Sequence, residues 1–336
     1  MKKKVILNIQ SVYTANAFHV GNEMYVGAGS ETTPQVYLSS LSSGESSLVD
    51  GCPGGVMSFV PVPGRQDLFY SIMGLFPPFV GLEAGVFMHR RTADGWETVR
   101  AMHLPFAHRC DILNKDGRNY IFAASCSKHK DNPADWSQSG ELYVIPLDGN
   151  GLPEEPELVY NVIWRHHGML KAVVEGEETI LFSGAEGIFR LVLDDSGKWQ
   201  AVSIFDQEVS EFGLIDMDGD GEDELVTIEP FHGNTVNIYD RTPEGWDKKY
   251  SGELSFGHGL SCGMFGGEPV VVVGNRRGSL TLDLIKAIDF SKGEFSREAI
   301  EQEAGPTQTQ VFTTEGIDYI LSANQLKNEV ALYTME

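Results

Sequence analysis

The stretch Phe212–Tyr239, FGLIDMDGDGEDELVTIEPFHGNTVNIY, decides the fold of the chain. Its centre spaces carboxylates at alternate positions, with glycines where the chain must turn, and adds a further acid downstream: Asp216, Asp218, Asp220 and Glu224. A hard divalent cation takes about six to eight oxygen ligands, which one short loop of this spacing supplies. The flanking runs FGLI and LVTI are short and apolar, so the loop is predicted to join two strands and not two helices. A solvated acidic turn without an ion is the alternative interpretation.

Composition limits the classes of partner and compartment. The 336 residues carry 25 basic and 48 acidic side chains, and the formal net charge of -23 argues against nucleic acid or an anionic membrane as a partner. Four widely spaced cysteines without a CxxC pattern are expected to be reduced core thiols. The N-terminal MKKKVILNIQ has too short an apolar run for a signal peptide and is predicted to be a strand. A cytoplasmic location is therefore expected.

The strand pattern of the opening stretch repeats along the whole chain. Short apolar runs alternate with glycine-rich turns, and no long segment keeps helical periodicity. Seven such units follow one another, and a period of about 45 to 50 residues is typical of propeller blades. The expected fold class is therefore all-β, a seven-bladed β-propeller that forms a single domain over residues 1–336. The last unit stops after its third strand at Tyr333, so the N-terminal run KKVILNI is expected to supply the fourth strand and close the ring.

Histidines recur near the start of the innermost strand in several units. Aligning the units places His19, His108, His167 and His258 at this position, with Glu211 there in the fifth unit. The innermost strands of a propeller line its central channel, so these side chains are expected to converge. Neutral imidazoles are common ligands of zinc, manganese and iron. The pattern therefore predicts an axial transition-metal site in which the metal keeps an open coordination position. Each histidine by itself could instead be a hydrogen-bonded structural residue.

The loops between second and third strands are expected to open on the same face as the histidines. The polar side chains on these loops are Lys128, His129, Glu186, His232, Arg276 and Asn324. In the second unit the same loop carries Phe76 and Phe79, which would lie at the rim. His232 could be only a turn residue, because its neighbours are turn formers, and Arg276 could lie at a solvated hairpin tip. The acidic loop would lie on the opposite face.

The acidic loop between strands is similar to the calcium-binding FG-GAP/VCBS repeat. The segments AHRCDI, RHHGML, IEPFHGN and FGHGLSCG also resemble the propeller domain of the fungal aldos-2-ulose dehydratases, which act on anhydrofructose and related keto-sugars. A more distant resemblance is to the propeller oligogalacturonate lyases, which hold a histidine-bound metal in the axial funnel. These resemblances imply a metal-assisted elimination of water or a glycosyl group from a small sugar substrate, β to its carbonyl.

The resemblance also implies roles for individual residues. His108, His167 and His258 would hold the transition metal, Zn, Mn or Fe, with Glu211 or His19 as further ligands. His232 or His129 would transfer the proton. The substrate hydroxyls would be oriented by Arg276, Glu186, Asn324 and Lys128. Calcium or magnesium in the acidic loop would be structural.

Two other functions are compatible with the sequence. The first is a non-catalytic propeller that binds carbohydrate or protein, since propellers serve widely as scaffolds. Such a scaffold does not require histidines at one register in several blades. The second is a metal-dependent hydrolase or lactonase, which product analysis would separate from a lyase. An unsaturated or dehydrated sugar would indicate a lyase, and a simple water adduct would indicate a hydrolase.

Overall fold

The computed structural model describes residues 1–49, 51–75 and 81–335, and its strands account for nearly all of the regular structure. The predicted rim residues Phe76 and Phe79 lie outside the described residues. The chain divides into two compact units, which we describe separately: unit 1 contains Met1–Ala17 and Val209–Glu336, and unit 2 contains Phe18–Glu208. Among the described residues, no helix is long and apolar enough to cross a membrane.

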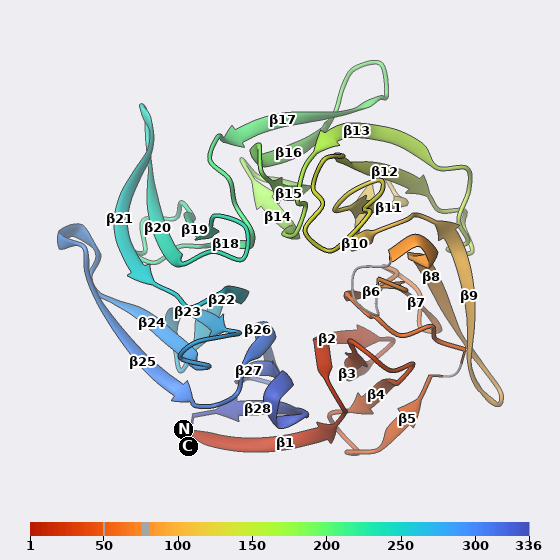
Figure 1. Cartoon of the computed structure of the whole chain (residues 1–336), viewed down its shortest axis with the longest axis horizontal. Coiled ribbons are helices and arrows are strands. Elements are labelled where there is room, and N and C mark those ends of the chain that lie inside the picture. Colours follow the sequence, from red (N-terminus) through yellow and green to blue (C-terminus); the bar gives the residue numbers. More distant parts are fainter. Residues whose placement is uncertain (50, 76–80, 336) are drawn as a thin grey trace. The chain divides into compact units, whose positions relative to one another are not determined.

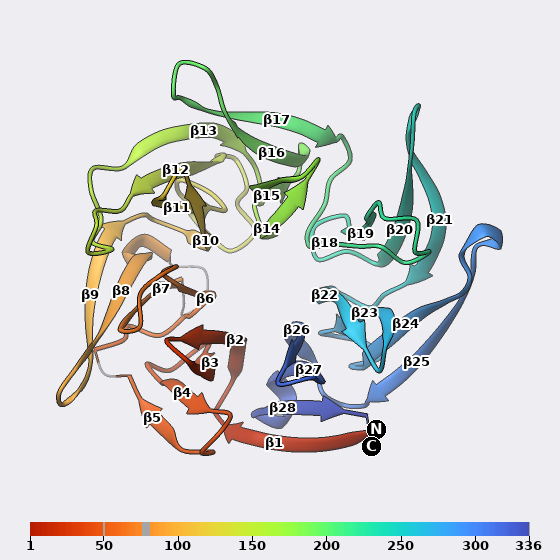
Figure 2. The same cartoon turned by 180° about the vertical axis from the view of Figure 1, so that it is seen from behind.

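Unit 2 holds four sheets of four strands, which we call blades 1 to 4. Blade 1 contains β2 (Val12–Val20), β3 (Glu23–Ser30), β4 (Val36–Ser40) and β5 (Ser46–Leu48), and the unit boundary falls inside β2. Blade 2 contains β6 (Ser58–Pro61), β7 (Leu68–Met73), β8 (Gly85–Thr92) and β9 (Gly95–His103), with the short helix η1 (Gly81–Glu83). Blade 3 contains β10 (Ala107–Lys115), β11 (Arg118–Ser125), β12 (Gly140–Pro146) and β13 (Glu157–Ile163). Blade 4, shown with its strands in order in Figure 2, contains β14 (Met169–Val174), β15 (Glu177–Gly184), β16 (Gly187–Leu193) and β17 (Trp199–Phe205).

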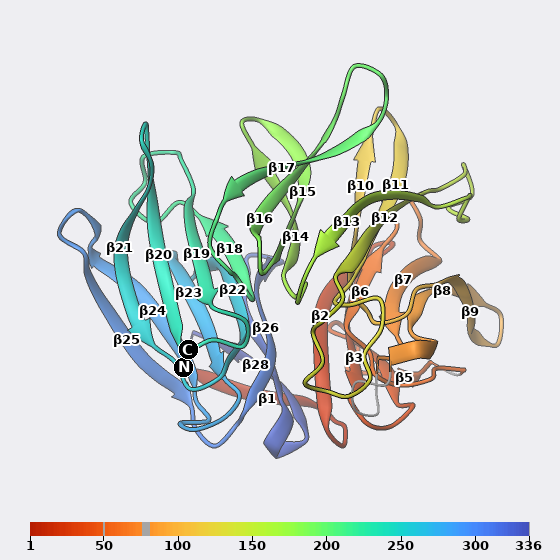
Figure 3. The ribbon, with the colours of Figure 1, turned by 45° about the horizontal axis from the view of Figure 1, so that its top comes forward.

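Unit 1 holds blades 5 to 7. Blade 5, whose strands lie side by side in Figure 3, contains β18 (Phe212–Ile215), β19 (Glu224–Glu229), β20 (Thr235–Thr242) and β21 (Gly245–Glu253). Blade 6 contains β22 (Gly257–Phe265), β23 (Glu268–Asn275), β24 (Leu282–Asp289), η2 (Phe290–Lys292) and β25 (Glu294–Glu301). Blade 7 contains β26 (Pro306–Thr314), β27 (Ile317–Asn324), η3 (Gln325–Lys327), β28 (Glu329–Thr334) and β1 (Lys2–Asn8).

The N-terminal strand completes the last blade, which confirms the prediction from the sequence. β1 pairs antiparallel with β28, from Lys2 opposite Thr334 to Asn8 opposite Glu329, and the two chain ends lie together (Figure 1). Lys3 adds ionic contacts from this strand, because its Nζ lies 2.5 Å from Glu301 and 2.6 Å from Glu329. The two ends of the chain therefore contribute strands to the same sheet.

Apolar faces of adjacent blades pack against one another within each unit. In unit 1 the buried side chains of blade 5, such as Ile228 and Val236, form one cluster with Leu260 and Val273 of blade 6. The approach is close at Gly213, where a Cβ atom would lie 2.7 Å from the Cys262 sulfur. Second strands such as β7 and β23 are mostly buried, whereas fourth strands such as β9 and β21 are mostly exposed. The exposure of the fourth strands agrees with their polar sequences, which predict that they lie at the outer edge of each blade.

Candidate functional site

Three innermost strands begin with a β-bulge at their second residue. The register shifts between Ala107 and Arg109 in β10, between Gly257 and Leu260 in β22, and between Pro306 and Gln308 in β26. The residues inside these bulges include His108, His258 and Thr307. A bulge leaves one residue out of the ladder and re-aims its side chain, which is why bulges are frequent beside functional sites.

In unit 2 three imidazoles gather at the start of blades 3 and 4. The ring centroids of His108 and His167 lie 4.5 Å apart, and those of His108 and His166 lie 6.2 Å apart. All three side chains are buried. His166 is oriented by the Ser183 carbonyl, which lies 2.9 Å from its Nδ1. Because a carbonyl only accepts, Nδ1 carries the proton and the lone pair of this ring is on Nε2.

Arg109 fixes the backbone that presents these histidines. Its Nε donates to the His167 carbonyl at 3.0 Å, and its Nη1 donates to the Met57 carbonyl at 2.7 Å. Arg109 is 8% exposed, so these charge-assisted bonds are shielded from water. Two of the predicted ligands, His108 and His167, are thus brought together, whereas His166 and Arg109 were missed. His166 is adjacent to a predicted residue, but no sequence signal marks Arg109.

In unit 1 a second group of side chains surrounds His258. Its Nδ1 lies 2.6 Å from the Thr307 carbonyl, and its Nε2 lies 2.9 Å from the Tyr13 hydroxyl. Tyr13 was missed by the sequence analysis, which aligned His19 in its place. Tyr13 is the second residue of β2, just as His108 and His258 are the second residues of β10 and β22. Counting from the strand start would have found it.

His232 reaches this group from the loop between β19 and β20. Its ring stacks on His258 with centroids 5.1 Å apart and contacts Phe256 at 4.7 Å. Its backbone has a left-handed φ of 48°, and its N–H donates to the Ser210 hydroxyl at 3.2 Å. His232 is therefore a turn residue, as the alternative interpretation held, and its imidazole also faces His258.

Arg276 is not at a solvated tip. Its Nε and Nη2 donate to the Gln325 side-chain oxygen at 3.2 and 3.0 Å. Its guanidinium carbon lies 5.1 Å from the centre of the Tyr13 ring. The predicted substrate-binding cation thus lies against the tyrosine of the same group.

The acidic loop joins β18 to β19, as predicted, and three of its four predicted ligands converge. One carboxylate oxygen from each of Asp216, Asp218 and Glu224 lies within 4.8 Å of the others. Glu224 is 1% exposed, and burial, together with the charges of Asp218 and Asp216, raises its pKa to about 7 even though the Met217 N–H opposes the shift. Asp220 lies outside this group, because it is exposed and accepts the Glu222 N–H at 2.8 Å.

Two predicted residues occupy positions other than those expected. His19 is next to the last residue of β2 and is exposed, so the expectation that it starts an innermost strand is wrong. Asn324 is fully buried within blade 7, where its amide donates to Glu329 at 2.9 Å and to Tyr333 at 3.0 Å. Its amide oxygen accepts the Ser322 hydroxyl at 2.7 Å, so this side chain stabilises the blade, and its assignment to substrate binding stays a prediction.

Three further predicted residues lie on loops of unit 2, between β11 and β12 and between β15 and β16. Lys128 and His129 are exposed, and His129 contacts Asp131 at 3.0 Å. The buried residue of that loop is Lys130, whose Nζ lies 3.1 Å from the centre of the Trp136 ring. Glu186 is half-buried and accepts the Trp164 N–H at 3.1 Å, and burial raises its pKa.

Glu211 directly precedes β18 and is 8% exposed. Its backbone carbonyl accepts the Ile228 N–H at 2.8 Å. It therefore has the predicted position before an innermost strand, and its assignment as a metal ligand stays a prediction.

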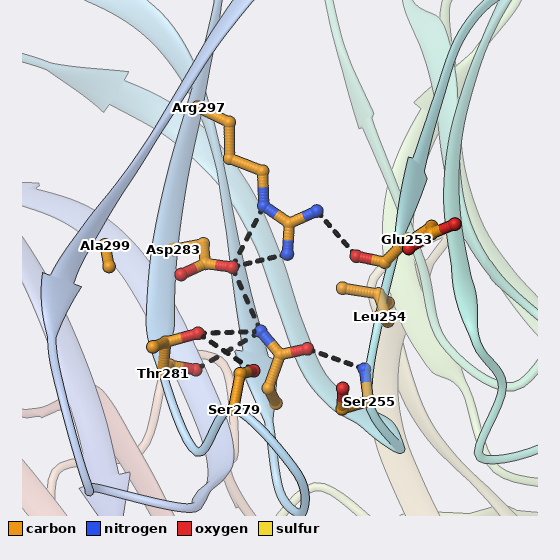
Figure 4. A pocket seen from close by; sticks show the side chains of 9 residues that line it. Glu253, Leu254, Ser255, Ser279, Thr281, Asp283, Arg297 and Ala299 are labelled. Atoms are coloured by element: carbon orange, nitrogen blue, oxygen red, sulfur yellow. Dashed lines mark hydrogen bonds and ion pairs between the residues drawn. The ribbon is translucent and has the colours of Figure 1, made fainter.

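A polar pocket of about 450 Å³ lies between the end of β21 and blade 6. Figure 4 shows Arg297 between the Asp283 carboxylate and the Glu253 carbonyl. Asp283 also accepts an N–H of Asn275 at 3.0 Å, and the Asn275 oxygen accepts the Ser255 N–H at 2.8 Å. Because these groups satisfy one another, the pocket is a structural polar network joining two blades.

Comparison with known proteins supports the fold class. No protein-family model and no curated protein matches the chain. Among solved structures, the β-propeller domain of Myceliophteria thermophila Cps50 (Swd1) is 8% identical, with a TM-score of 0.63 and full coverage of both chains. The Dos1 propeller is 9% identical, with a TM-score of 0.55, and the match covers 93% of this chain and 75% of that chain. The fold is a seven-bladed β-propeller, and similarity at this identity carries no function.

Proposed function

We propose that this chain is a metal-dependent carbohydrate lyase that catalyses β-elimination on a keto-sugar. The observation that carries the proposal is the approach of the His108 and His167 rings, 4.5 Å between centroids, at the start of two neighbouring blades. Both side chains are buried, and imidazole nitrogens that converge in this way are suited to bind one metal ion.

The donor set of unit 2 fits a transition metal. Imidazole nitrogen suits zinc, iron and manganese, whereas hard cations prefer oxygen. His108 and His167 would hold the ion, and His166 is oriented by a carbonyl in the way that is typical of ligating histidines. When bound, such an ion polarises the substrate carbonyl and stabilises the enolate that follows loss of the neighbouring proton. The sequence also predicts His258 of unit 1 as a ligand, and this stays a prediction.

We also propose a structural cation in the acidic loop of blade 5. The three converging carboxylates of Asp216, Asp218 and Glu224 fit calcium or magnesium, both of which take oxygen ligands. Glu224 is nearly inaccessible to water, and a bound cation would supply the opposite charge that its carboxylate lacks. The ion would fix the hairpin that begins the blade.

Elemental analysis of the purified protein tests the metal proposal. We expect about one transition metal per chain in the wild type and its loss in His108→Ala/His167→Ala, while calcium or magnesium is retained. His103→Ala is the matched control, because this exposed histidine at the end of β9 hydrogen-bonds the Leu82 carbonyl of η1. A wild type that carries only the hard cation would contradict the proposal and favour the binding-scaffold function.

Product analysis then tests the reaction class. Keto-sugars and keto-glycosides incubated with the metal-loaded protein should give an unsaturated or dehydrated sugar, detected by mass spectrometry as loss of water or of the glycosyl group. A product that has gained water would identify a hydrolase or lactonase instead. The double variant should be inactive in either case, which separates the metal site from the reaction class.

A further inference from the structure

We infer that the pocket between the end of β21 and blade 6 binds a neutral, polyhydroxylated small molecule of about monosaccharide size. The pocket has a volume of about 450 Å³, within the range of about 300 to 1,000 Å³ that small-molecule sites occupy. All of its lining residues belong to unit 1. The inference goes beyond the proposed elimination and does not depend on it, because it concerns binding at blade 6 and not the histidines of unit 2.

The polar network in the wall of the pocket uses only part of its hydrogen-bonding capacity. Among the described residues, the hydrogen bonds to the Asp283 side chain all end on one oxygen, Oδ2, which accepts from Asn275 and from Nε and Nη2 of Arg297. In Figure 4 the other oxygen, Oδ1, points away from Arg297 and toward Ala299. Asp283 is 5% exposed, and buried polar atoms of proteins usually have a hydrogen-bond partner. A ligand hydroxyl that donates to Oδ1 would supply that partner.

Hydroxyl groups line the pocket beside this carboxylate. Ser255, Ser279 and Thr281 each contribute one, and the Ser279 hydroxyl lies 3.3 Å from that of Thr281. The loop between β23 and β24 passes close to Ser255, because a Cβ atom at Gly278 would lie only 2.7 Å from the Ser255 Oγ. A hydroxyl both donates and accepts hydrogen bonds, so this set of groups matches the hydroxyls of a sugar or polyol.

The walls of the pocket are held in place by one buried amide. The Asn275 side-chain oxygen accepts the Ser255 N–H at 2.8 Å, and its Nδ2 donates to the Thr281 hydroxyl and to Asp283, both at 3.0 Å. Asn275 therefore joins three sides of the pocket. A site that is already ordered loses little conformational freedom when a ligand binds, which favours the binding of a small molecule.

The charges of the pocket favour a neutral ligand. The Arg297 guanidinium pairs with Asp283 and also donates to the Glu253 carbonyl at 2.7 Å, so its positive charge is compensated within the wall. Glu253 is exposed, and its carboxylate adds negative charge at the pocket. An anion would therefore meet carboxylates and an arginine that is already paired. Leu254 and Ala299 add apolar surface, against which the C–H groups of a sugar can pack.

Nitrogen-15 NMR titration of the full chain tests the inference. The neutral probes are D-glucose, D-galactose and xylitol, and we expect at least one of them to move the Arg297 Nε–H and Asn275 Nδ2–H signals. Ala299→Trp should lose these shifts, because the indole would fill the pocket without replacing a member of the polar network. Glu298→Trp is the matched control and should keep them, since adjacent residues of β25 point to opposite faces and Glu298 is also exposed.

A second variant and two charged probes complete the test. Ser279→Ala removes only an exposed hydroxyl and should weaken the binding of the same sugar. Signals that stay in place with every neutral probe, or equal shifts in Ala299→Trp, would overturn the inference. Tighter binding of D-glucuronate or D-glucosamine than of every neutral probe would overturn the assignment to a neutral ligand. A protein that acts on no keto-sugar can still show the shifts, so the proposed function and this site can fail separately.

Discussion

Single residues of this protein show how burial decides the chemistry of an imidazole. His89 is fully buried between the Ser71 hydroxyl, 2.8 Å from its Nε2, and the Thr98 hydroxyl, 3.0 Å from its Nδ1. Loss of hydration disfavours the charged ring and lowers the pKa of His89 to about 3. Its ring also stacks on Phe69 with centroids 4.4 Å apart. His89 is therefore a neutral, hydrogen-bonded core residue.

This shift predicts a pH dependence of stability. In the unfolded chain the ring binds a proton below its ordinary pKa of about 6.5, whereas the folded protein does not until about 3. The unfolded state therefore holds more protons in this window, and stability falls as the pH falls, by about 3 kcal/mol at pH 4. Denaturant titrations should show this slope weakened in His89→Gln, and unchanged in the exposed control His19→Gln. Equal slopes in all three proteins would contradict the prediction.

At the residue scale, the sequence predicts the place of a residue along its strand better than it predicts the contacts of its side chain. His108 and His258 were predicted because both follow the first residue of an innermost strand. Tyr13 has the same position, but the alignment followed residue type and selected His19. Asn324 was predicted to face a substrate, yet its contacts come from Glu329 and Tyr333 within its own blade. Side-chain direction at these strand starts depends on β-bulges, which have no sequence signature here.

At the scale of elements, the strands and the acidic loop were the most predictable features. Their signals are local, since apolar alternation and turn residues lie within a few positions of each other. The carboxylates of Asp216, Asp218 and Glu224 converge because one hairpin carries all of them. The polar network of Asn275, Asp283 and Arg297 was not predicted, because it joins strands whose packing the sequence alone does not show.

Removing the ion from the acidic loop should destabilise the protein. Without a cation, the buried Glu224 carboxylate faces Asp218 and Asp216 and carries an uncompensated charge, so calcium or magnesium should raise the melting temperature. We expect a chelator to lower the melting temperature of the wild type by several degrees, and to have a much smaller effect on Glu224→Gln. Asp220→Asn is the matched control, since Asp220 is outside the converging group and should keep the full response.

The ion pair that lines the pocket gives a second prediction at this scale. Arg297 donates to Asp283 through Nε at 2.9 Å and through Nη2, and the Asp283 side chain is only 7% exposed. Arg297→Met would remove the cation that pairs with a buried carboxylate, at a cost of about 3 to 5 kcal/mol. Asp283→Leu/Arg297→Met removes both charges and should cost less than the single change. Chemical denaturation of the wild type, the single variant and the double variant gives the order of their free energies of unfolding. A double variant less stable than Arg297→Met would contradict the prediction.

At the scale of the whole molecule, the sequence predicted seven blades and their completion by the N-terminus. This was possible because the repeat count and the missing fourth strand after Tyr333 can both be read along the chain. The fold is shared with propellers that are only 8% and 9% identical, so the architecture depends on pattern and not on particular residues. The side-chain groups around His108 and His258 depend on individual residues, and the sequence predicted them only in part.

The N-terminal strand should contribute to stability far beyond its own length. β1 covers β28, which would otherwise present an unpaired edge, and Lys3 joins it to Glu301 and Glu329. Deleting residues 1–8 should therefore lower the melting temperature and lead to association through the open edge, seen as larger species in light scattering. Lys3→Met should lower the melting temperature with β1 still paired, because Glu301 and Glu329 lose a shared cation, and the protein should stay as the wild type in size. Lys2→Met is the control for charge alone. A truncated chain with the size and stability of the wild type would contradict the prediction, because it would show that blade 7 is stable without β1.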